Sequence, residues 1–221
     1  MKLDATFVRS AVAAADFPRD GTPQIALVGR SNVGKSTLIN ALVRQRVART
    51  SAAPGKTRQA NIYRVARGAG PALYLVDLPG YGYARGGAPS TREFDELTRS
   101  YFGRERQEGR DLAALLLVDC RHPGLASDRQ AWQWLNESVE RAAIVATKID
   151  KLARGERIRA LRQLESVFDS VVVPVSAATG EGMDELWNLI DRLAKPPHRN
   201  NNSSSLPRRN QTARPRPLRK R

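Results

Sequence analysis

Two glycines, a lysine and a serine near the start of the chain have the spacing of a phosphate-binding loop. Residues 29–36 read Gly-Arg-Ser-Asn-Val-Gly-Lys-Ser, between an apolar run at 25–28 and a helix-compatible stretch at 37–43. A loop of this kind turns successive backbone N–H groups toward one point at the positive end of a helix, where a di- or triphosphate binds. Lys35 would reach the outer phosphates, and the Ser36 hydroxyl would ligate Mg²⁺. The alternative is an ordinary turn before a helix, which the flanking strand and helix signals disfavour.

An acidic residue and a glycine after a later apolar run suit the metal and the terminal phosphate. Asp77 opens the segment Asp77-Leu78-Pro79-Gly80, so its carboxylate can hold Mg²⁺ through water while the Gly80 N–H faces the phosphate. By itself this segment could be an ordinary turn. Thr57, in the Pro/Gly loop at 51–59, is the candidate to complete the Mg²⁺ shell from a loop that orders with the γ-phosphate. We expect Ser36, Thr57 and Asp77 as metal ligands and Lys35, Thr57 and Gly80 as catalytic residues.

Residues 147–150, Thr-Lys-Ile-Asp, suit recognition of guanine. The Asp150 carboxylate can accept hydrogen bonds from N1–H and the exocyclic amine of guanine, a donor pair that adenine lacks, so the segment favours GTP over ATP. The stem of Lys148 would lie along the base, and Ser176 with Ala177 would close over it. The alternative, a solvated turn, does not account for the position of the segment after a phosphate loop.

A second glycine-rich loop follows Asp77. Residues 80–87 contain four glycines together with two tyrosines and an arginine. Glycine imposes little backbone order, so this loop suits switching, and its aromatic and basic residues could bind a partner in one state. The alternative is a surface loop without a function.

Apolar segments alternate with helix-period segments along the chain, which positions these loops. We predict strands at 24–29, 60–66, 72–77, 112–118, 142–147 and 171–175, and helices at 35–46, 91–107, 127–140, 155–168 and 182–194. The second and third strands are separated by a five-residue turn and should form a hairpin. The expected fold is therefore a three-layer α/β P-loop domain with a six-stranded, mostly parallel sheet and one antiparallel edge strand.

The predicted loops should meet at one edge of the sheet, because ligands of such folds lie beyond the carboxyl ends of the parallel strands. We expect residues 1–23 to be a lead-in packed on this domain, 24–194 the domain itself and 195–221 a disordered tail. The residues expected to contact the nucleotide are Gly29, Arg30, Ser31, Asn32, Val33, Gly34, Lys35, Ser36, Thr37, Gly55, Lys56, Thr57, Arg58, Gln59, Asp77, Leu78, Pro79, Gly80, Thr147, Lys148, Ile149, Asp150, Ser176, Ala177 and Ala178.

Composition agrees with a single cytoplasmic domain. The chain has 221 residues, of which 41% are hydrophobic, and one cysteine, Cys120. A lone cysteine cannot form an internal disulfide, which favours a reducing compartment. The longest apolar run, 112–118, is far shorter than a membrane span, so we expect no integral membrane segment, and a monomer.

The positive charge is concentrated at the carboxyl terminus. The formal net charge is +15, and residues 195–221 contain nine basic side chains and no acidic one. This Asn/Ser/Pro/Arg-rich segment cannot bury enough apolar surface to fold, and its charge suits an RNA phosphate backbone. The alternatives are a solubilising tail and, without a lipid-anchor cysteine, contact with an anionic membrane.

These motifs resemble those of the TrmE-Era-EngA-EngB-septin group of translation-associated GTPases, and most closely the EngB family. The resemblance implies hydrolysis of GTP to GDP and phosphate, a switch role in assembly of the large ribosomal subunit, and a link to cell division and septation. It implies large-subunit precursor and ribosomal RNA as partners, and it makes stimulation by K⁺ beside Asn32 a hypothesis. It covers residues 6–193, on the segments 29–37, 54–57, 77–84, 119–123 and 147–152.

Two residues depart from the general GTPase pattern. Thr147 replaces the asparagine common in the guanine motif, as is usual in EngB proteins, and we expect looser nucleotide binding. Tyr81 stands where Ras-like enzymes have a water-orienting glutamine, so we expect slow intrinsic hydrolysis. Two other functions stay open: a metabolic P-loop kinase, which leaves residues 147–150 unexplained, and a GTP-dependent RNA-binding scaffold with negligible turnover.

Overall fold

A computed structural model describes residues 3–49, 59–81, 96–107 and 112–195. Seven strands in the order β1-β3-β4-β2-β5-β6-β7 form its single sheet. The strands are β1 (Leu3–Ala11), β2 (Gln24–Gly29), β3 (Ala60–Arg67), β4 (Leu73–Asp77), β5 (Leu112–Asp119), β6 (Arg141–Thr147) and β7 (Val172–Pro174). The helices are α1 (Lys35–Val43), α2 (Glu96–Gln107), α3 (Ala126–Ser138), α4 (Arg154–Phe168) and α5 (Met183–Leu193), with short 3₁₀ helices η1 (Ala14–Asp16) and η2 (Ile149–Lys151).

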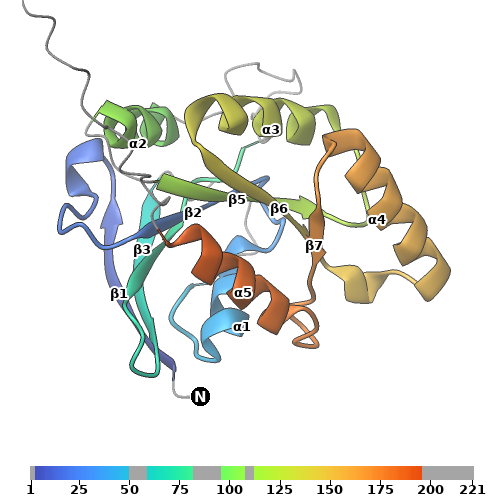
Figure 1. Ribbon diagram of the computed structural model, residues 1–221, viewed down its shortest axis with the longest axis horizontal. Coiled ribbons are helices and arrows are strands. Elements are labelled where there is room, and N and C mark those ends of the chain that lie inside the picture. Colours follow the sequence, from blue (N-terminus) through green and yellow to red (C-terminus); the bar gives the residue numbers. More distant parts are fainter. Residues whose placement is uncertain (1–2, 50–58, 82–95, 108–111, 196–221) are drawn as a thin grey trace, which may run out of the picture.

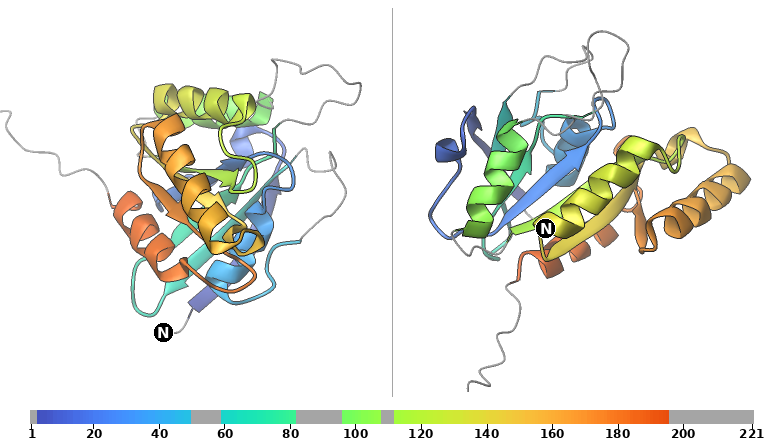
Figure 2. Two further views of the ribbon diagram at one scale, coloured as in Figure 1. Left: turned by 90° about the vertical axis from the view of Figure 1, so that its right-hand side faces the viewer. Right: turned by 90° about the horizontal axis from the view of Figure 1, so that it is seen from above.

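The predicted three-layer architecture is confirmed. One hydrophobic cluster joins the sheet to α2, α3 and α4, and a second joins its other face to α1 and α5. Figures 1 and 2 show α2 and α3 on one side of the sheet and α1 and α5 on the other. Strand β5 lies between β2 and β6 and is buried along its whole length, as a parallel strand covered on both faces should be.

The sheet has one strand more than the six predicted from sequence. Residues 3–11, which were expected to be a lead-in, form β1 and pair antiparallel with β3. Strand β3 also pairs antiparallel with β4, so the antiparallel strand lies inside the sheet instead of at its edge. A bulge interrupts the β1–β3 register between Phe7 and Arg9. Most of β1 is exposed, and its sequence therefore lacks the apolar alternation by which strands are recognised.

The parallel part of the sheet determines where the loops lie. Strand β2 pairs in parallel with β4 and β5, β5 with β6, and β6 with β7. The carboxyl ends of these five strands therefore point to the same edge (Figure 1). The loops that follow β2, β4, β6 and β7 carry the residues that sequence reasoning selected, and they meet at this edge.

Candidate nucleotide-binding site

The loop between β2 and α1 has the geometry of a phosphate cradle. Asn32 and Gly34 have φ angles of 63° and 111°, so the chain bends sharply before α1 begins at Lys35. The Lys35 ammonium is buried and donates to the carbonyl oxygens of Gly29, at 3.1 Å, and Arg30, at 3.5 Å. Burial lowers the pKa of Lys35, and the Asp77 charge opposes this effect. An anion at the mouth of the loop would stabilise this buried cation.

Ser36 and Asp77 bring a hydroxyl and a carboxylate together beside this lysine. The Ser36 hydroxyl donates to Asp77 Oδ2 at 2.7 Å. Burial raises the pKa of Asp77, while Lys35 and the hydrogen bond from Ser36 oppose the rise. Within the described ranges, no three His, Cys, Asp or Glu side chains gather around a common point. The oxygen pair fits Mg²⁺, which is held by one or two protein oxygens together with phosphates and water, and does not suit a metal that needs an all-protein cage.

Gly80 packs against the phosphate loop. A Cβ at this position would lie 2.7 Å from the Ser31 nitrogen, so no other residue fits without moving the backbone. The next residue, Tyr81, accepts a hydrogen bond from the Ser31 N–H at 3.1 Å. The Tyr81 hydroxyl points away from the loop and donates to Asp128 Oδ1 at 2.9 Å, in the protein interior. In this conformation the phenol cannot orient a water molecule beside the phosphates.

Lys148 joins the base loop to the phosphate loop. Its ammonium donates to the Asn32 carbonyl at 2.5 Å and to Asp119 Oδ2 at 3.0 Å. Its own backbone is left-handed, with φ 62°, which turns the chain into η2 and presents Asp150. Lys148 therefore helps to fix the distance between the two halves of the candidate site.

Asp119 and Arg121 support Lys148, whereas the sequence analysis used them only as part of the motif at 119–123. The Arg121 guanidinium donates to both Asp119 oxygens, at 2.9 and 2.7 Å, and the Arg121 N–H donates at 3.1 Å. Burial opposes ionisation of Asp119, but the hydrogen bonds from Arg121 and Lys148 outweigh it and hold its pKa well below the usual range. The signal in the sequence was Asp119-Cys120-Arg121 at the end of an apolar strand, where parallel strands place functional groups.

The residues that the sequence analysis selected for base recognition lie close together. The Ser176 hydroxyl donates to Asp150 Oδ1 at 2.7 Å, and this bond, opposed by burial and assisted by Lys151, lowers the pKa of Asp150. Asp150 is therefore an ionised acceptor. Ser176 is buried, whereas Ala177 is half-buried and Ala178 exposed. A hydrogen bond from the Ser176 N–H to the Glu181 carbonyl, at 2.9 Å, closes the loop behind them.

Thr147 anchors the same loop. Its hydroxyl lies 2.8 Å from the Val33 carbonyl and 3.1 Å from the Val118 carbonyl. One hydroxyl has one proton to donate, so it bonds fully to one of them at a time. An asparagine amide would have two protons, which gives a physical reason for the expectation of looser nucleotide binding.

Some predicted residues lie outside the described ranges. They are the tail, most of the second glycine loop, and Gly55, Lys56, Thr57 and Arg58. Gln59, the first described residue after that gap, is exposed. The side chain of Arg30, predicted to contact nucleotide, lies instead against α3, with Nε 3.4 Å from Asp128 Oδ1.

The fold and the loops at its carboxyl edge define a P-loop GTPase. A family model described as "50S ribosome-binding GTPase" matches residues 24–148. Probable GTP-binding protein EngB of Lacticaseibacillus casei is 41% identical over 86% of this chain and 96% of its own length. Its counterpart in Heliobacterium modesticaldum is 40% identical over 86% and 93%. The chain belongs to the EngB family of GTP-binding proteins.

Solved structures agree on the fold. Era of Aquifex aeolicus bound to GDP·AlF₄⁻ superposes with a TM-score of 0.62 and 25% identity, over 78% of this chain and 56% of Era. An Era complex with MgGDPNP and a 16S ribosomal RNA segment matches equally well. A probable GTP-binding protein EngB gives a TM-score of 0.53 at 24% identity, over 77% and 98%. In the part of the chain that the structure describes, no helix has the length and apolar character needed to span a bilayer.

Proposed function

We propose that this protein binds Mg·GTP at the carboxyl edge of its sheet and hydrolyses it slowly as a switch. The main support is that Lys148 links two loops. One is the phosphate cradle at 29–36, and the other presents the ionised Asp150 beside Ser176 as an acceptor for guanine. The kinase alternative requires no guanine acceptor, so competition between guanine and adenine nucleotides tests it. Displacement of labelled GDP by ATP at the same concentrations as by GTP would contradict the proposal.

Each group has a role in this proposal. The loop N–H groups and Lys35 bind the phosphates, Ser36 and Asp77 hold Mg²⁺, and the Gly80 N–H receives the terminal phosphate. When bound, Mg²⁺ neutralises charge on the phosphate oxygens. Thr57 is proposed to complete the metal shell. Asp150 accepts from the base, and Ser176, Ala177 and Ala178 cover it.

The proposed hydrolysis is slow because of the position of Tyr81. Its hydroxyl is bonded to Asp128 in the interior, so the phenol is not available to orient the attacking water. We expect an intrinsic rate near the unassisted value of about 10⁻⁴ s⁻¹. Single-turnover hydrolysis with and without large-subunit precursor measures it. A fast rate for the isolated protein would refute the expectation, and no stimulation by the precursor would favour the scaffold alternative.

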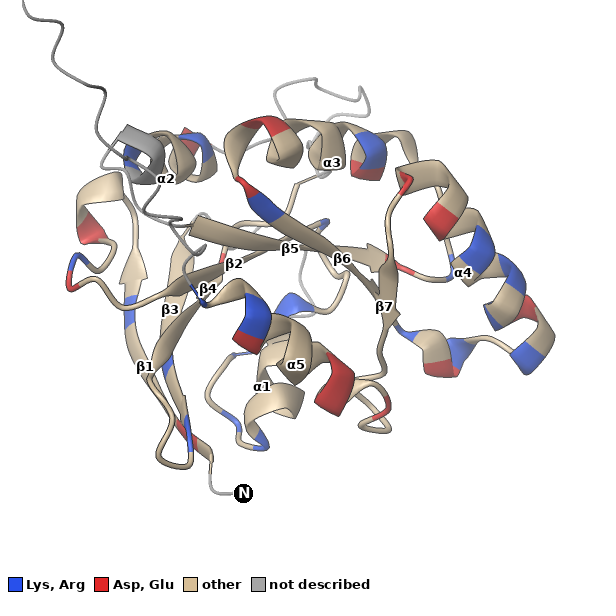
Figure 3. Ribbon diagram, viewed as in Figure 1, with Lys and Arg blue, Asp and Glu red and all other residues tan. Residues whose placement is uncertain are grey.

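The proposed partner is the large ribosomal subunit precursor, with a consequent role in cell division. The family, the rRNA complex of Era and the nine cations of residues 195–221 support it. In the described part, α4 adds exposed arginines at 154, 159 and 162 (Figure 3). Deleting residues 196–221 should reduce the salt dependence of binding to the precursor, because fewer counterions are released. An unchanged slope would remove the tail from the interface.

Stimulation by K⁺ remains a proposal that rests on Asn32. Its left-handed backbone places the side chain at the exposed mouth of the phosphate loop. Hydrolysis measured in K⁺ and in Na⁺ at equal ionic strength tests it, with Asn32→Ala as the control that should abolish any difference. Equal hydrolysis rates of the wild-type protein in K⁺ and in Na⁺ would contradict stimulation by K⁺.

A further inference from the structure

A buried carboxylate on α3 lies outside the roles assigned so far. Asp128 is in the first turn of α3 and is 1% exposed. Its Oδ1 accepts the Tyr81 hydroxyl at 2.9 Å and lies 3.4 Å from Arg30 Nε. Among the described residues, its Oδ2 and the Arg30 Nε have no hydrogen-bond partner. We name Arg30, Tyr81 and Asp128 the α3 latch.

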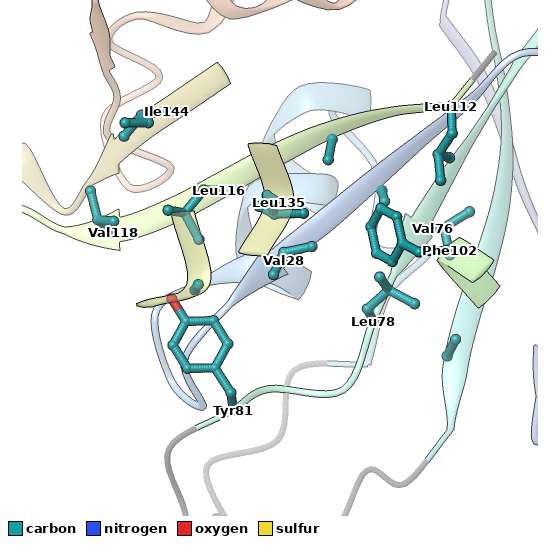
Figure 4. Packing of buried hydrophobic residues seen from close by; sticks show 14 of the residues in the cluster. Val28, Val76, Leu78, Tyr81, Phe102, Leu112, Leu116, Val118, Leu135 and Ile144 are labelled. Atoms are coloured by element: carbon teal, nitrogen blue, oxygen red, sulfur yellow. The ribbon is translucent and has the colours of Figure 1, made fainter. Parts of the chain in front are cut away.

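If the α3 latch had only a structural role, its buried carboxylate would lower the stability of the folded protein. A buried carboxylate with one oxygen unsatisfied is destabilising relative to an apolar side chain of similar size. Figure 4 shows the Tyr81 ring beside Val28 and Leu116, with its oxygen directed toward the chain of α3. A phenylalanine would fill this apolar space equally well. The polar atoms therefore serve something other than packing.

The backbone is anchored on both sides of Gly80, and the α3 latch provides one of the two anchors. On one side, the Leu78 N–H donates to the Leu27 carbonyl of β2 at 3.3 Å. On the other, the Tyr81 carbonyl accepts from the Ser31 N–H, and the Tyr81 side chain is fixed to Asp128. Gly80 therefore lies between two anchored residues, Leu78 and Tyr81. The anchoring of Tyr81 depends on Asp128 of α3.

We propose that Asp128 is a positioning residue for the GTPase site: by holding Tyr81 in the core, it aligns the Gly80 N–H with the terminal phosphate. The inference rests on the proposed function. In the proposed function the Gly80 N–H meets the terminal phosphate, which GDP lacks, so the α3 latch should favour GTP over GDP. Loss of the latch affects the triphosphate complex and leaves GDP binding unchanged.

The test compares affinities for fluorescent GDP and for a fluorescent non-hydrolysable GTP analogue in the full chain. For Tyr81→Phe and Asp128→Ala we expect GDP affinity like the wild type and analogue affinity about tenfold weaker, the worth of one charge-assisted hydrogen bond. Asp128→Asn keeps an oxygen acceptor for Tyr81 and should restore most of the discrimination. Arg129→Ala, an exposed change on the same turn of α3, is the matched control and should equal the wild type.

A double-mutant cycle separates positioning from general destabilisation. If Tyr81 and Asp128 act as one unit, the double variant Tyr81→Phe/Asp128→Ala loses no more than either single variant. A merely structural role would weaken both nucleotides together. Should Asp128→Ala not fold, Tyr81→Phe carries the test, since it removes one oxygen and keeps the ring.

The outcomes distinguish the inference from the proposed function. If the wild-type protein binds neither nucleotide, the proposed function fails, and the inference with it. If the wild type binds both and the variants keep its ratio of affinities, the inference alone is overturned. A raised preference for the analogue in Asp128→Ala also overturns it, because the α3 latch would then hold the GDP-bound arrangement.

Discussion

Gly182 allows a quantitative test of how α5 fixes the base-recognition loop. This residue precedes α5 with φ +78°, and a Cβ there would lie 2.1 Å from the Pro174 carbonyl oxygen. Gly180, two residues earlier, has φ +82° and no atom within 4 Å of its Cβ position. The two glycines share a left-handed backbone and differ in steric surroundings. Gly180→Ala is therefore a matched control for Gly182→Ala.

The magnitudes follow from these two environments. Alanine in the left-handed region costs about 1–2 kcal/mol at either position. At Gly182 the added Cβ also comes nearly 1 Å closer than the 3.0 Å limit of real contacts, so the backbone must move. Overpacking of this kind costs a further ~1–3 kcal/mol. We expect Gly182→Ala to reduce the free energy of unfolding by about 2–5 kcal/mol and Gly180→Ala by about 1–2 kcal/mol.

Urea unfolding followed by tryptophan fluorescence measures both variants, and GDP titration measures the site. Ser176 bonds to both Gly180 and Glu181, but only the Cβ of Gly182→Ala displaces the backbone. GDP binding should therefore weaken in Gly182→Ala and stay nearly unchanged in Gly180→Ala. Equal unfolding free energies for the two variants would refute the steric argument. A large loss of stability with unchanged GDP affinity would refute the coupling to the base loop.

Three further predictions concern the charged groups of the site. Asp150→Asn should weaken GDP binding by roughly 10²–10⁴-fold, because two charge-assisted bonds to the base are lost; competition titration measures this, with Arg159→Ala, an exposed change on α4, as the control. Ser36→Ala should reduce the gain in GDP affinity that Mg²⁺ gives over EDTA, and an undiminished gain would exclude Ser36 from the metal shell. Asp119 has a lowered pKa in the folded state, so its stabilisation is present above the unfolded value of about 3.9 and lost as pH falls below it. The stability difference between wild type and Asp119→Asn should therefore shrink on acidification, and a constant difference would contradict this.

Most of the sheet could be predicted from the sequence because its strands are buried on both faces. Strands such as β5 appear as continuous apolar runs, and the helices between them show a 3.6-residue period. Strand β1 could not be predicted in this way. Its residues Phe7 and Val8 are exposed, as is Val12 just after the strand. Its pairing depends on β3, whose paired residues lie 49 (60 − 11) to 64 (67 − 3) positions later in the chain.

The site was predictable where the chemistry is local and not where it depends on tertiary contacts. The residue types and spacing within 29–36 and within 147–150 are enough to predict a phosphate loop and a guanine-recognition segment. The bonds from Lys148 to Asn32, and from Tyr81 to Asp128, span 116 and 47 residues. No local pattern marks Asp128 as a partner of Tyr81, because an acidic residue in the first turn of a helix is explained equally well by the helix dipole.

The position of β1 has a consequence for synthesis of the chain. Residues 3–11 are made early, yet their ladder forms only against β3 at residues 60–67. Until β3 has been made, the backbone N–H and C=O groups of β1 have no ladder partner within the sheet, and Phe7 has no Tyr63 ring to stack on. During this interval the segment at 3–11 is therefore open to chaperones or to mispairing with another chain. The bulge after Phe7 makes that early strand irregular, which discourages such mispairing.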